Sequence, residues 1–340
     1  MRVLIIGRTE ILYETVRMLS SKHTICGILT APAVPEYART EHDFEKLAGE
    51  LGCPFLCTKT LNQQALKFIS QAEPEIAVST NWVSVIDQHV TSLFSHGILN
   101  AHHGDLPRYR GNAAINWAII KHEPQIPLNV HQMEPGELDA GDIFVRRWLT
   151  LTETTTIKNI LDFMEQNIPT MFLESLDGLE NGTIAPIKQS ETGQTPSRCY
   201  PRLPVYSKID WKQPARDIDA IIRASTRPYS GAYSYLKVEK RIKKVYIWRS
   251  RVVSDETNDI GIPGHIIKND KVSGESWVFT GQGILAIGLV QYESEREFEP
   301  GKTWKSIRMR FGVDVEAELI ALYNELTSII TAQSSCDEVG

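Results

Sequence analysis

Two polar side chains near the middle of the chain have the types and spacing that acyl transfer to an amine requires. Asn100 and His102 stand two residues apart, directly after the apolar run Gly97-Ile98-Leu99. In an extended segment, side chains at i and i+2 point the same way, so both can face one cleft. An imidazole exchanges protons near neutrality, and an amide N–H can donate to a developing oxyanion. The pair therefore predicts attack of an amine on a carbonyl group.

An acid that orients the imidazole would complete such a site. The segment Leu138-Asp139-Ala140-Gly141-Asp142 supplies two carboxylates in a turn-prone setting. A carboxylate that accepts the imidazole N–H fixes the tautomer of the ring and raises its basicity. The spacing alone does not decide between Asp139 and Asp142.

The elements around these residues predict a doubly wound α/β domain, because short apolar runs alternate with helical patterns. Strands are expected at residues 3–6, 25–30, 54–56, 76–79 and 97–100, and helices at about residues 11–19, 42–51, 65–69 and 155–179. This alternation implies a mostly parallel sheet with helices on both sides, and ligand crevices form at the carboxyl ends of such strands. Pro169 is expected to kink or divide the last helix. A Gly-x-Gly-x-x-Gly fingerprint is missing after Gly7, so NAD is not expected.

The second half of the chain has a different pattern. Residues 188–206 are rich in Ser, Thr, Gly, Gln and Pro and suit a connection between domains. A helix at residues 214–225 and five short strand patterns between residues 233 and 287 favour a small antiparallel barrel. A final helix, at about residues 315–330, is followed by a polar tail expected to be disordered. The expected division is 1–195 for the α/β domain, 196–310 for the barrel with its leading linker, and 311–340 for the helix and tail.

Composition narrows the class of protein. A chain of 340 residues, 42% of them hydrophobic, suits two cores. The net charge of −6 disfavours nucleic acid as a partner. Five scattered cysteines without C-x-x-C spacing indicate neither a disulfide framework nor a metal site. The absence of a leader pattern and of a long apolar run predicts a cytoplasmic protein without a membrane partner.

The motifs resemble the signature of the 10-formyltetrahydrofolate-dependent formyltransferases. That signature is Asn-x-His, then Leu-Pro-x-Tyr-Arg-Gly, then a Leu-Asp-x-Gly-Asp turn, and residues 100–111 and 138–142 match it. The resemblance covers about residues 1 to 310 and is strongest to the nucleotide-sugar N-formyltransferases. It implies a Rossmann-like formyltransferase fold with an OB-like barrel, 10-formyltetrahydrofolate as the formyl donor, and catalytic roles for Asn100, His102 and Asp139. The chain departs from the family pattern at His103-Gly104-Asp105 and Ala113-Ala114, which bears on substrate choice more than on chemistry.

The resemblance also implies binding residues. Those expected around the folate are Leu106, Pro107, Tyr109, Arg110, Gly111, Val130, Gln132, Leu138 and Asp142. Those expected around the acceptor are Trp82, His103, Asp105, Arg198, Tyr200, Arg202, Tyr206 and Lys208. The aromatic members of the second set can stack on a base and its cations can meet a diphosphate, although core aromatics and solvated surface charges are the ordinary alternatives.

The acceptor is expected to be a nucleotide-linked amino sugar. A formyltransferase that acts on tRNA has to neutralise several phosphates, usually through a basic insertion after the second strand. The corresponding residues 31–45 contain Glu36, Glu41, Asp43 and Glu45 against Arg39 alone. A dTDP-4-amino-4,6-dideoxyhexose, used for bacterial O-antigen or capsule synthesis, is the best guess from the family. Methionyl-tRNA formyltransferase and formyltetrahydrofolate hydrolase are the alternatives, and the family makes a homodimer plausible.

Overall fold

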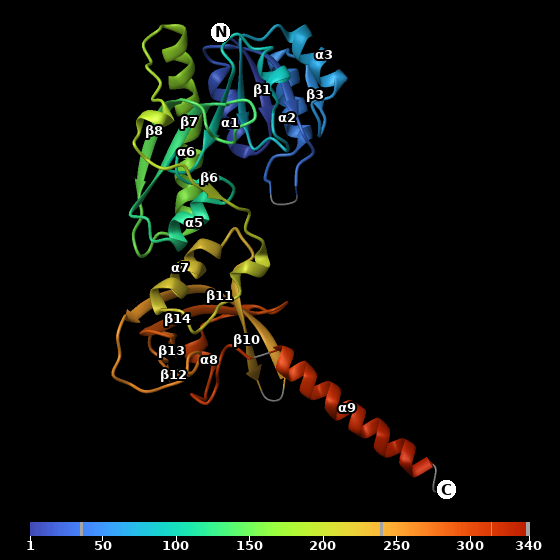
Figure 1. Cartoon of the computed structure of the whole chain (residues 1–340), viewed down its shortest axis with the longest axis vertical. Helices are drawn as coiled ribbons and strands as arrows, with labels where there is room; N and C mark the ends of the chain where they lie inside the picture. The colour runs from blue at the N-terminus through green and yellow to red at the C-terminus, as the bar shows by residue number, and fades with distance from the viewer. Residues whose placement is uncertain (35–36, 239–240, 314, 338–340) are drawn as a thin grey trace. The chain divides into compact units, whose positions relative to one another are not determined.

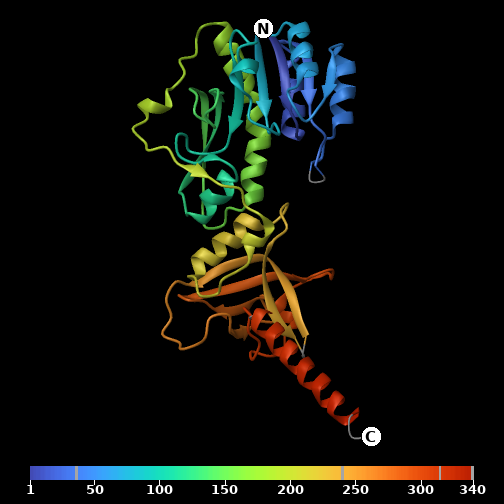
Figure 2. The same cartoon turned by 45° about the vertical axis from the view of Figure 1, so that its right-hand side comes forward.

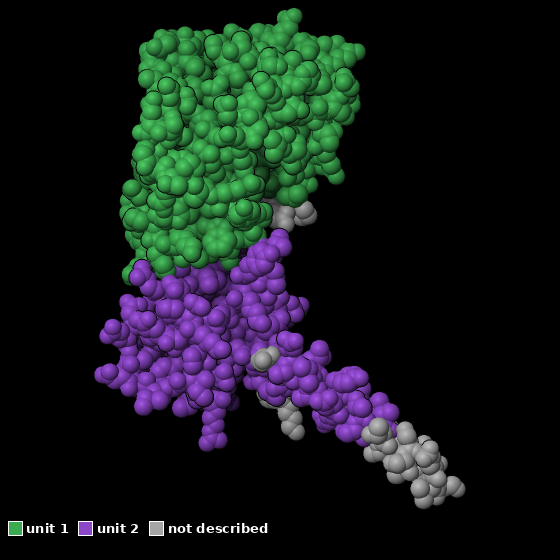
Figure 3. Space-filling model, in the orientation of Figure 1, with its two compact units in different colours: residues 1–202 green, residues 203–340 purple. Residues whose placement is uncertain are grey.

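The computed structural model describes residues 1–34, 37–238, 241–313 and 315–337, with side chains described as far as residue 330. The chain divides into two compact units, Met1–Arg202 and Leu203–Gly340, which Figure 3 shows in green and purple. Each unit contains a hydrophobic cluster of its own. The boundaries expected at residues 195 and 310 stay a prediction.

The first unit is built on a mixed sheet. Its strands are β1 (Arg2–Gly7), β2 (Thr24–Thr30), β3 (Phe55–Cys57), β4 (Ile76–Thr80), β5 (Ile98–His102), β7 (Gln125–Gln132) and β8 (Ile143–Thr150). They lie in the order β3-β2-β1-β4-β5-β7-β8. The strands from β3 to β5 are parallel, whereas β7 and β8 extend the sheet in antiparallel fashion. The expected α/β class is confirmed.

Helices cover both faces of this sheet (Figures 1 and 2). They are α1 (Glu10–Leu19), α2 (Glu41–Leu51), α3 (Gln63–Ala72), α4 (Gln88–Thr91), α5 (Ala114–Ile120) and α6 (Ile157–Glu180). Helix α1 packs on α6 and touches α2 through an edge-on contact between Tyr13 and Phe44. Helix α3 packs on the opposite face, where Ala65 and Ile69 join Leu4 of β1 in one buried cluster.

Helix α6 runs without a break through Pro169, so this proline does not divide the helix as one expectation had it. A proline in a helix removes one backbone hydrogen bond and crowds the preceding turn. Here Ile168, Met171 and Phe172 are fully buried on either side of Pro169. Burial of these side chains offsets the local cost and keeps the helix continuous.

The second unit is antiparallel. Its elements are η2 (Pro204–Ser207), α7 (Ala215–Ser225), β10 (Ala232–Val238), β11 (Arg241–Ser254), β12 (Ile266–Asn269), β13 (Ser276–Phe279), β14 (Ile284–Tyr292), β15 (Glu297–Phe298) and α8 (Pro300–Thr303). The sheet order is β10-β11-β14-β13-β12, with β15 against β14. Helix α7 packs on β11 and β14 and buries Ile218 and Ile222 in the core.

The segment after α8 links the two edges of this sheet. Phe311 forms an antiparallel β-bridge with Leu236 of β10. The neighbouring Arg310 forms another with His265, directly before β12. The Gly312 N–H donates to the Tyr235 carbonyl at 3.1 Å, and the Ile266 N–H donates to the Met309 carbonyl at 3.1 Å. Edge strands joined in this way leave fewer unpaired backbone groups, which agrees with the predicted barrel.

Helix α9 (Val315–Asp337) follows, and Figure 1 shows it in red as one continuous helix. The tail expected to be disordered after residue 330 is therefore helical as far as residue 337, and residues 338–340 lie outside the described residues. Among the described residues, every helix falls short of the length and apolar character that a membrane span requires.

We expect Phe311→Ala to destabilise the second unit by about 3–5 kcal/mol, because it removes a fully buried ring from the segment that joins both sheet edges. Phe311 is 0% exposed and stacks on Trp211 with ring centroids 4.8 Å apart. Urea unfolding of the full chain, followed by tryptophan fluorescence, measures the loss. Ile307→Ala, at a side chain that is 55% exposed, is the matched control. Equal free energies of unfolding for both variants would contradict the role of Phe311 in joining the two sheet edges.

Candidate active site

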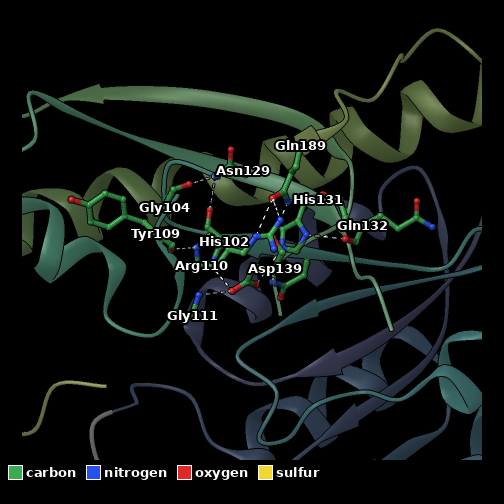
Figure 4. A network of polar contacts seen from close by, with 12 residues as sticks. His102, Gly104, Tyr109, Arg110, Gly111, Asn129, His131, Gln132, Asp139 and Gln189 are labelled. Atoms are coloured by element: carbon green, nitrogen blue, oxygen red, sulfur yellow. Dashed lines mark hydrogen bonds and ion pairs between the residues drawn. The ribbon is translucent and has the colours of Figure 1, made fainter. Parts of the chain in front are cut away.

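The antiparallel pairing of β5 with β7 brings four polar residues to one face of the sheet. Asn100 lies opposite His131, and His102 lies opposite Asn129. Residues directly opposite each other in an antiparallel pair point to the same face. Each strand therefore carries an Asn-x-His sequence, and the asparagine of one strand faces the histidine of the other. Figure 4 shows His102, His131 and Asp139 close together in this site.

His131 connects Asn100 to the acid of the site. Its Nε2 lies 3.2 Å from Asn100 Nδ2 and 3.5 Å from Asp139 Oδ1, and its Nδ1 lies 2.8 Å from the Gln132 carbonyl oxygen. His131 is 1% exposed. The sequence expectations did not include this residue, although the repeated Asn-x-His spacing at residues 129–131 is a signal for it.

Asn129 holds the backbone on which His102 stands. Its Nδ2 donates to the carbonyl oxygens of His102 at 3.2 Å and Gly104 at 2.6 Å. Its Oδ1 accepts from Arg146 Nε at 2.7 Å. Both N–H contacts of this buried amide reach the end of β5 or the loop after it, so Asn129 fixes the path of that loop.

Asp139 is the acid that lies beside the imidazole. Its Oδ2 is 3.4 Å from His102 Nδ1 and accepts the Gly111 N–H at 2.8 Å. Burial alone would raise the pKa of Asp139, but the neighbouring His102 and the Gly111 N–H that donates to the carboxylate hold this pKa well below its usual range. The carboxylate is therefore ionised at neutral pH.

The turn that carries Asp139 is strained and closely packed. Asp139 has φ 53°, in the left-handed region. At Gly141 a β-carbon would lie 2.8 Å from the carbonyl carbon of Gln132, so glycine lets the turn approach β7. The other acid that the spacing left open, Asp142, lies at the start of β8, where its carbonyl oxygen accepts the Gln132 N–H at 2.9 Å.

His102 is buried, and its two ring nitrogens face different acceptors. Nδ1 faces Asp139, and Nε2 lies 2.8 Å from the Tyr109 carbonyl oxygen. Burial lowers the pKa of His102, and Asp139 and the Tyr109 carbonyl oppose this only in part. A β-carbon at Gly104 would lie 2.7 Å from His102 Nε2 and would also meet the Tyr109 carbonyl. Gly104 therefore leaves the space in which Nε2 meets its partner.

Gln189 fastens the Asp139 turn from outside the sheet. It lies in η1 (Gln189–Glu191) and is 4% exposed. Its Nε2 donates to the carbonyl oxygens of Asp139 at 2.7 Å and Gly141 at 2.8 Å, while its Oε1 accepts from Arg110 Nη2 at 2.8 Å. The sequence pattern gave this segment only as a linker, and no spacing pointed to Gln189.

The residues expected around the folate lie along the loop after β5, on β7 and in the turn between β7 and β8. Leu106 and Val130 are fully buried, whereas Leu138 is 39% exposed next to Asp139. The Pro107 carbonyl oxygen accepts the Ser197 N–H at 3.3 Å, and Gln132 and Asp142 form the backbone pair described above.

The same loop is held by its own side chains. The Tyr109 hydroxyl donates to Glu123 at 2.7 Å, and Arg110 binds Gln189. Gly111 belongs to β6 (Arg110–Gly111), which pairs with β9 (Arg198–Cys199). The loop is therefore preorganised by contacts within the first unit.

Some residues expected around the acceptor gather near β6. Arg198 pairs with Arg110 through β9 and lies over the ring of Tyr200 at 5.4 Å. The Tyr200 carbonyl oxygen accepts Trp117 Nε1–H at 3.0 Å, and the Arg202 guanidinium lies 5.5 Å from the Trp117 ring centroid. The segment from residue 198 to 202 thus runs alongside the loop after β5.

The remaining expected acceptor residues have other surroundings. Asp105 lies 3.5 Å from Arg108 and 3.8 Å from Arg146, and His103 stacks beside His102 with ring centroids 6.3 Å apart. Trp82 packs against the buried cluster that contains α3. Tyr206 and Lys208 belong to the second unit, where Lys208 lies 5.7 Å from the ring centroid of Tyr235.

We expect His103→Asn to make the fold less sensitive to acid. Burial lowers the pKa of His103 to about 3, against 6.5 for an ordinary histidine. The unfolded chain therefore takes up this proton first, so stability that is complete above pH 6.5 is lost as pH falls from 6.5 toward 3. Urea midpoints at pH 7.5 and 4.5 measure the loss. The drop should be smaller in His103→Asn than in the parent, and unchanged in His42→Asn, whose side chain is 86% exposed. Equal drops in all three proteins would contradict a partly buried His103 that stays neutral.

Family models match both halves of the chain. Residues 3–176 match the family model described as formyl transferase, and residues 205–308 match the formyl transferase C-terminal domain. The methionyl-tRNA formyltransferase of Caldanaerobacter subterraneus subsp. tengcongensis is 27% identical over 307 residues, which is 87% of this chain and 94% of that protein.

Two solved structures share the fold. The N-formyltransferase from Helicobacter canadensis, in complex with folinic acid and dTDP-3-aminofucose, has a TM-score of 0.64 at 14% identity and covers 86% of this chain and 100% of that one. HypX from Aquifex aeolicus, in complex with tetrahydrofolic acid, has a TM-score of 0.55 at 17% identity over 91% of this chain. The chain spans about half the length of HypX, 50%. With both domain models matched along its length, the chain belongs to the formyl transferase family.

Proposed function

We propose that this chain transfers a formyl group from 10-formyltetrahydrofolate to the primary amine of a nucleotide-linked amino sugar. The observation that carries the proposal is the meeting of Asn100, His102 and Asp139 in a member of the formyl transferase family. An amide donor, a neutral imidazole and an ionised carboxylate are the groups that acyl transfer to an amine uses.

In the proposed reaction, the amine nitrogen forms a bond to the formyl carbon, and the bond from that carbon to the folate nitrogen breaks. Asn100 donates an amide N–H to the negative charge that develops on the formyl oxygen. His102 Nε2 takes the proton that the amine loses and delivers it to the leaving nitrogen. Asp139 accepts the Nδ1–H of His102 while Nε2 acts as the base, and it stabilises the imidazolium that forms. To reach the amine, Nε2 has to turn from the Tyr109 carbonyl oxygen, which lies 2.8 Å away.

His131 is the positioning residue for Asn100. When His131 Nδ1–H donates to the Gln132 carbonyl, Nε2 accepts one of the two N–H bonds of the Asn100 amide. This contact decides which end of the amide turns toward the substrate and leaves the second N–H for the formyl oxygen. The proposed oxyanion donor is thereby oriented before the substrate binds.

The residues present suit a folate donor, which supplies the activated formyl group. The solved relatives from Helicobacter canadensis and Aquifex aeolicus hold folinic acid and tetrahydrofolic acid, respectively. In this chain, the exposed Leu138 stands one residue before Asp139 and offers apolar surface to a flat ring. The closely packed Asp139 turn would then hold the donor next to His102.

Charge favours a sugar nucleotide over tRNA as the acceptor. Arg39, the one cation among residues 31–45, lies 3.8 Å from Glu14 and 3.7 Å from Asp43, and its guanidinium covers the Tyr13 ring at 4.3 Å. Glu41 accepts the Ala33 N–H at 2.8 Å. Glu41 and Asp43 therefore make contacts that hold this segment in place, whereas Glu36 lies outside the described residues. A segment of this kind repels a polyphosphate backbone.

Methionyl-tRNA formyltransferase stays the alternative, and one surface favours it. On the outer face of β10 and β11, Lys244 lies within 4.7 Å of the ring centroids of Tyr233 and Tyr246, and Arg227 lies over Trp248 at 4.4 Å. Cations interleaved with aromatic rings are a common surface for single-stranded nucleic acid. The sequence relatives that bear the methionyl-tRNA name point the same way.

An acceptor panel tests the proposal. Formyl transfer from 10-formyltetrahydrofolate is measured with dTDP-, UDP- and GDP-linked amino sugars, with charged initiator tRNA, and without acceptor, where formate release reports hydrolysis. We expect turnover with an amino sugar, reduced about 10²- to 10³-fold in Asn100→Ala because one oxyanion donor is lost. Turnover only with the tRNA would show that the acceptor is tRNA and not a sugar nucleotide. Formate release without turnover on any acceptor would indicate a hydrolase. Undiminished turnover in Asn100→Ala would refute the site.

The pH profile of Asp139→Asn tests the role of the carboxylate. Protonation of His102 stops the reaction, so kcat/KM falls on the acid side, below pH 6.5 because the pKa of His102 is lowered. Asp139 raises that pKa in part, so its removal should move the acid limb to still lower pH while the plateau falls. Ionisation of the substrate amine also affects kcat/KM, but it does so equally in both enzymes and does not change the difference between their profiles. Asp162→Asn on α6 is the control with an unchanged profile. An acid limb that stays in place in Asp139→Asn would contradict the assignment.

A further inference from the structure

Helix α9 carries an exposed heptad seam that the proposed formyl transfer does not use. The helix begins at Val315, beyond residue 308, where the match to the formyl transferase C-terminal domain ends. Leu319, Leu322, Leu326 and Ile329 follow one another at spacings of three, four and three residues, and we call these four residues the α9 seam. Alternating spacings of three and four place side chains along one line, at the a and d positions of a coiled coil.

The α9 seam is exposed in the single chain. Leu319 is 67% exposed, Leu322 59%, Leu326 60% and Ile329 50%. Every residue from Leu319 to Ile330 is exposed. Soluble monomers rarely leave a continuous row of large apolar side chains in water, and a helix without a packed face is marginally stable there. A partner that covers the seam is therefore required.

The first turns of α9 are held to the second unit by an ion pair. Lys237 Nζ of β10 lies 2.9 Å from Glu318 Oε1. Glu318 occupies the g position of the heptad, at the flank of the seam. The ion pair fixes the start of the helix and leaves the seam beyond it uncovered.

The charges of α9 exclude one class of partner. Between residues 315 and 330 the charged side chains are Glu316, Glu318 and Glu325, without Lys or Arg. Helices that lie on membranes carry cations on the polar face, because membrane surfaces are anionic. A purely acidic helix is repelled by such a surface, so the seam suits protein rather than lipid.

We propose that the α9 seam binds the same helix of further copies of this chain, so that the protein self-associates through a parallel coiled coil. A heptad seam is self-complementary, since a and d side chains of one helix fill the spaces between those of an identical helix. A second copy of α9 is enough to cover the seam, because the same repeat provides both surfaces.

The flanking positions favour the parallel orientation. In a parallel coiled coil the g position of one helix faces the e position of the next. Glu318 and Glu325 at g then face Tyr323 and Ile330 at e, whose side chains are 70% and 55% exposed in the single chain. In an antiparallel pair g faces g, which would bring glutamates together. The parallel arrangement covers two further apolar residues and avoids this repulsion.

Sedimentation velocity and light scattering on the full chain test the proposal. We expect a mass of at least twice 38.3 kDa for the parent protein at tens of micromolar. The double variant Leu322→Asp and Leu326→Asp should sediment as a single chain, because it places charges in the seam. The matched control, Ala321→Asp and Asn324→Asp, adds the same charges at the c and f positions and should keep the parent mass.

A parent protein that is a single chain at this concentration would overturn the proposal, and so would a seam variant that keeps the parent mass. Urea unfolding of the first and second units is compared between the parent and both double variants. If it is unchanged, a change of mass does not come from misfolding. Orientation is read in a chain whose native Cys57 and Cys336 are replaced by Ser. There, oxidation should link Leu322→Cys between chains in a parallel pair, and Asn324→Cys is the control that should not link. Absence of the Leu322→Cys link in a protein of unchanged mass would overturn the parallel orientation.

Discussion

The antiparallel ladder between β5 and β7 is the constraint on which the site depends. It places Asn100 opposite His131 and His102 opposite Asn129. Side chains alternate between the faces of a sheet, so a slip of one residue would send the members of these pairs to opposite faces. The amide that orients the loop after β5 and the histidine that orients the proposed oxyanion donor are therefore both placed by the same register. The parallel strands β1 to β4 extend the sheet on one side of this ladder, and β8 pairs with β7 on the other.

The protonation states of His102 and Asp139 also depend on where the fold places them. His102 is kept neutral by burial, whereas the buried Asp139 is kept ionised by its neighbours. Their side chains are only 7% and 8% exposed, so an interaction between them is stronger than it would be on the surface. The two residues stand on segments 37 positions apart in the chain, and the left-handed turn at Asp139 is the local price of bringing them together.

Local patterns predicted much of this fold because they act locally. The apolar runs at residues 3–6 and 76–79 marked buried strands, and the i, i+2 spacing of Asn100 and His102 marked a shared face. The choice between Asp139 and Asp142 was beyond spacing, since it depends on the left-handed conformation of Asp139 and on a hydrogen bond from Gly111. The family resemblance, rather than the spacing, pointed to Asp139.

Other features depend on contacts between distant segments. The continuity of α6 through Pro169 reflects burial that a sequence window does not contain. His131 carried a local signal, the second Asn-x-His, whose meaning appears only when β7 is paired with β5. Gln189 carried none, because a glutamine in a polar linker has no distinguishing spacing, and the turn that it holds is fifty positions away.

The position of Gln189 has a consequence for what counts as the catalytic domain. The formyl transferase model ends at residue 176, yet Gln189 and β9 lie after it and hold the Asp139 turn and the loop after β5. A fragment cut at the family boundary would keep Asn100, His102 and Asp139 but release the brace that sets their geometry. The first unit extends to Arg202. The segment between the two family matches is therefore needed to position the site. An insertion in this segment would shift the Asp139 turn and change its distance from the His102 imidazole.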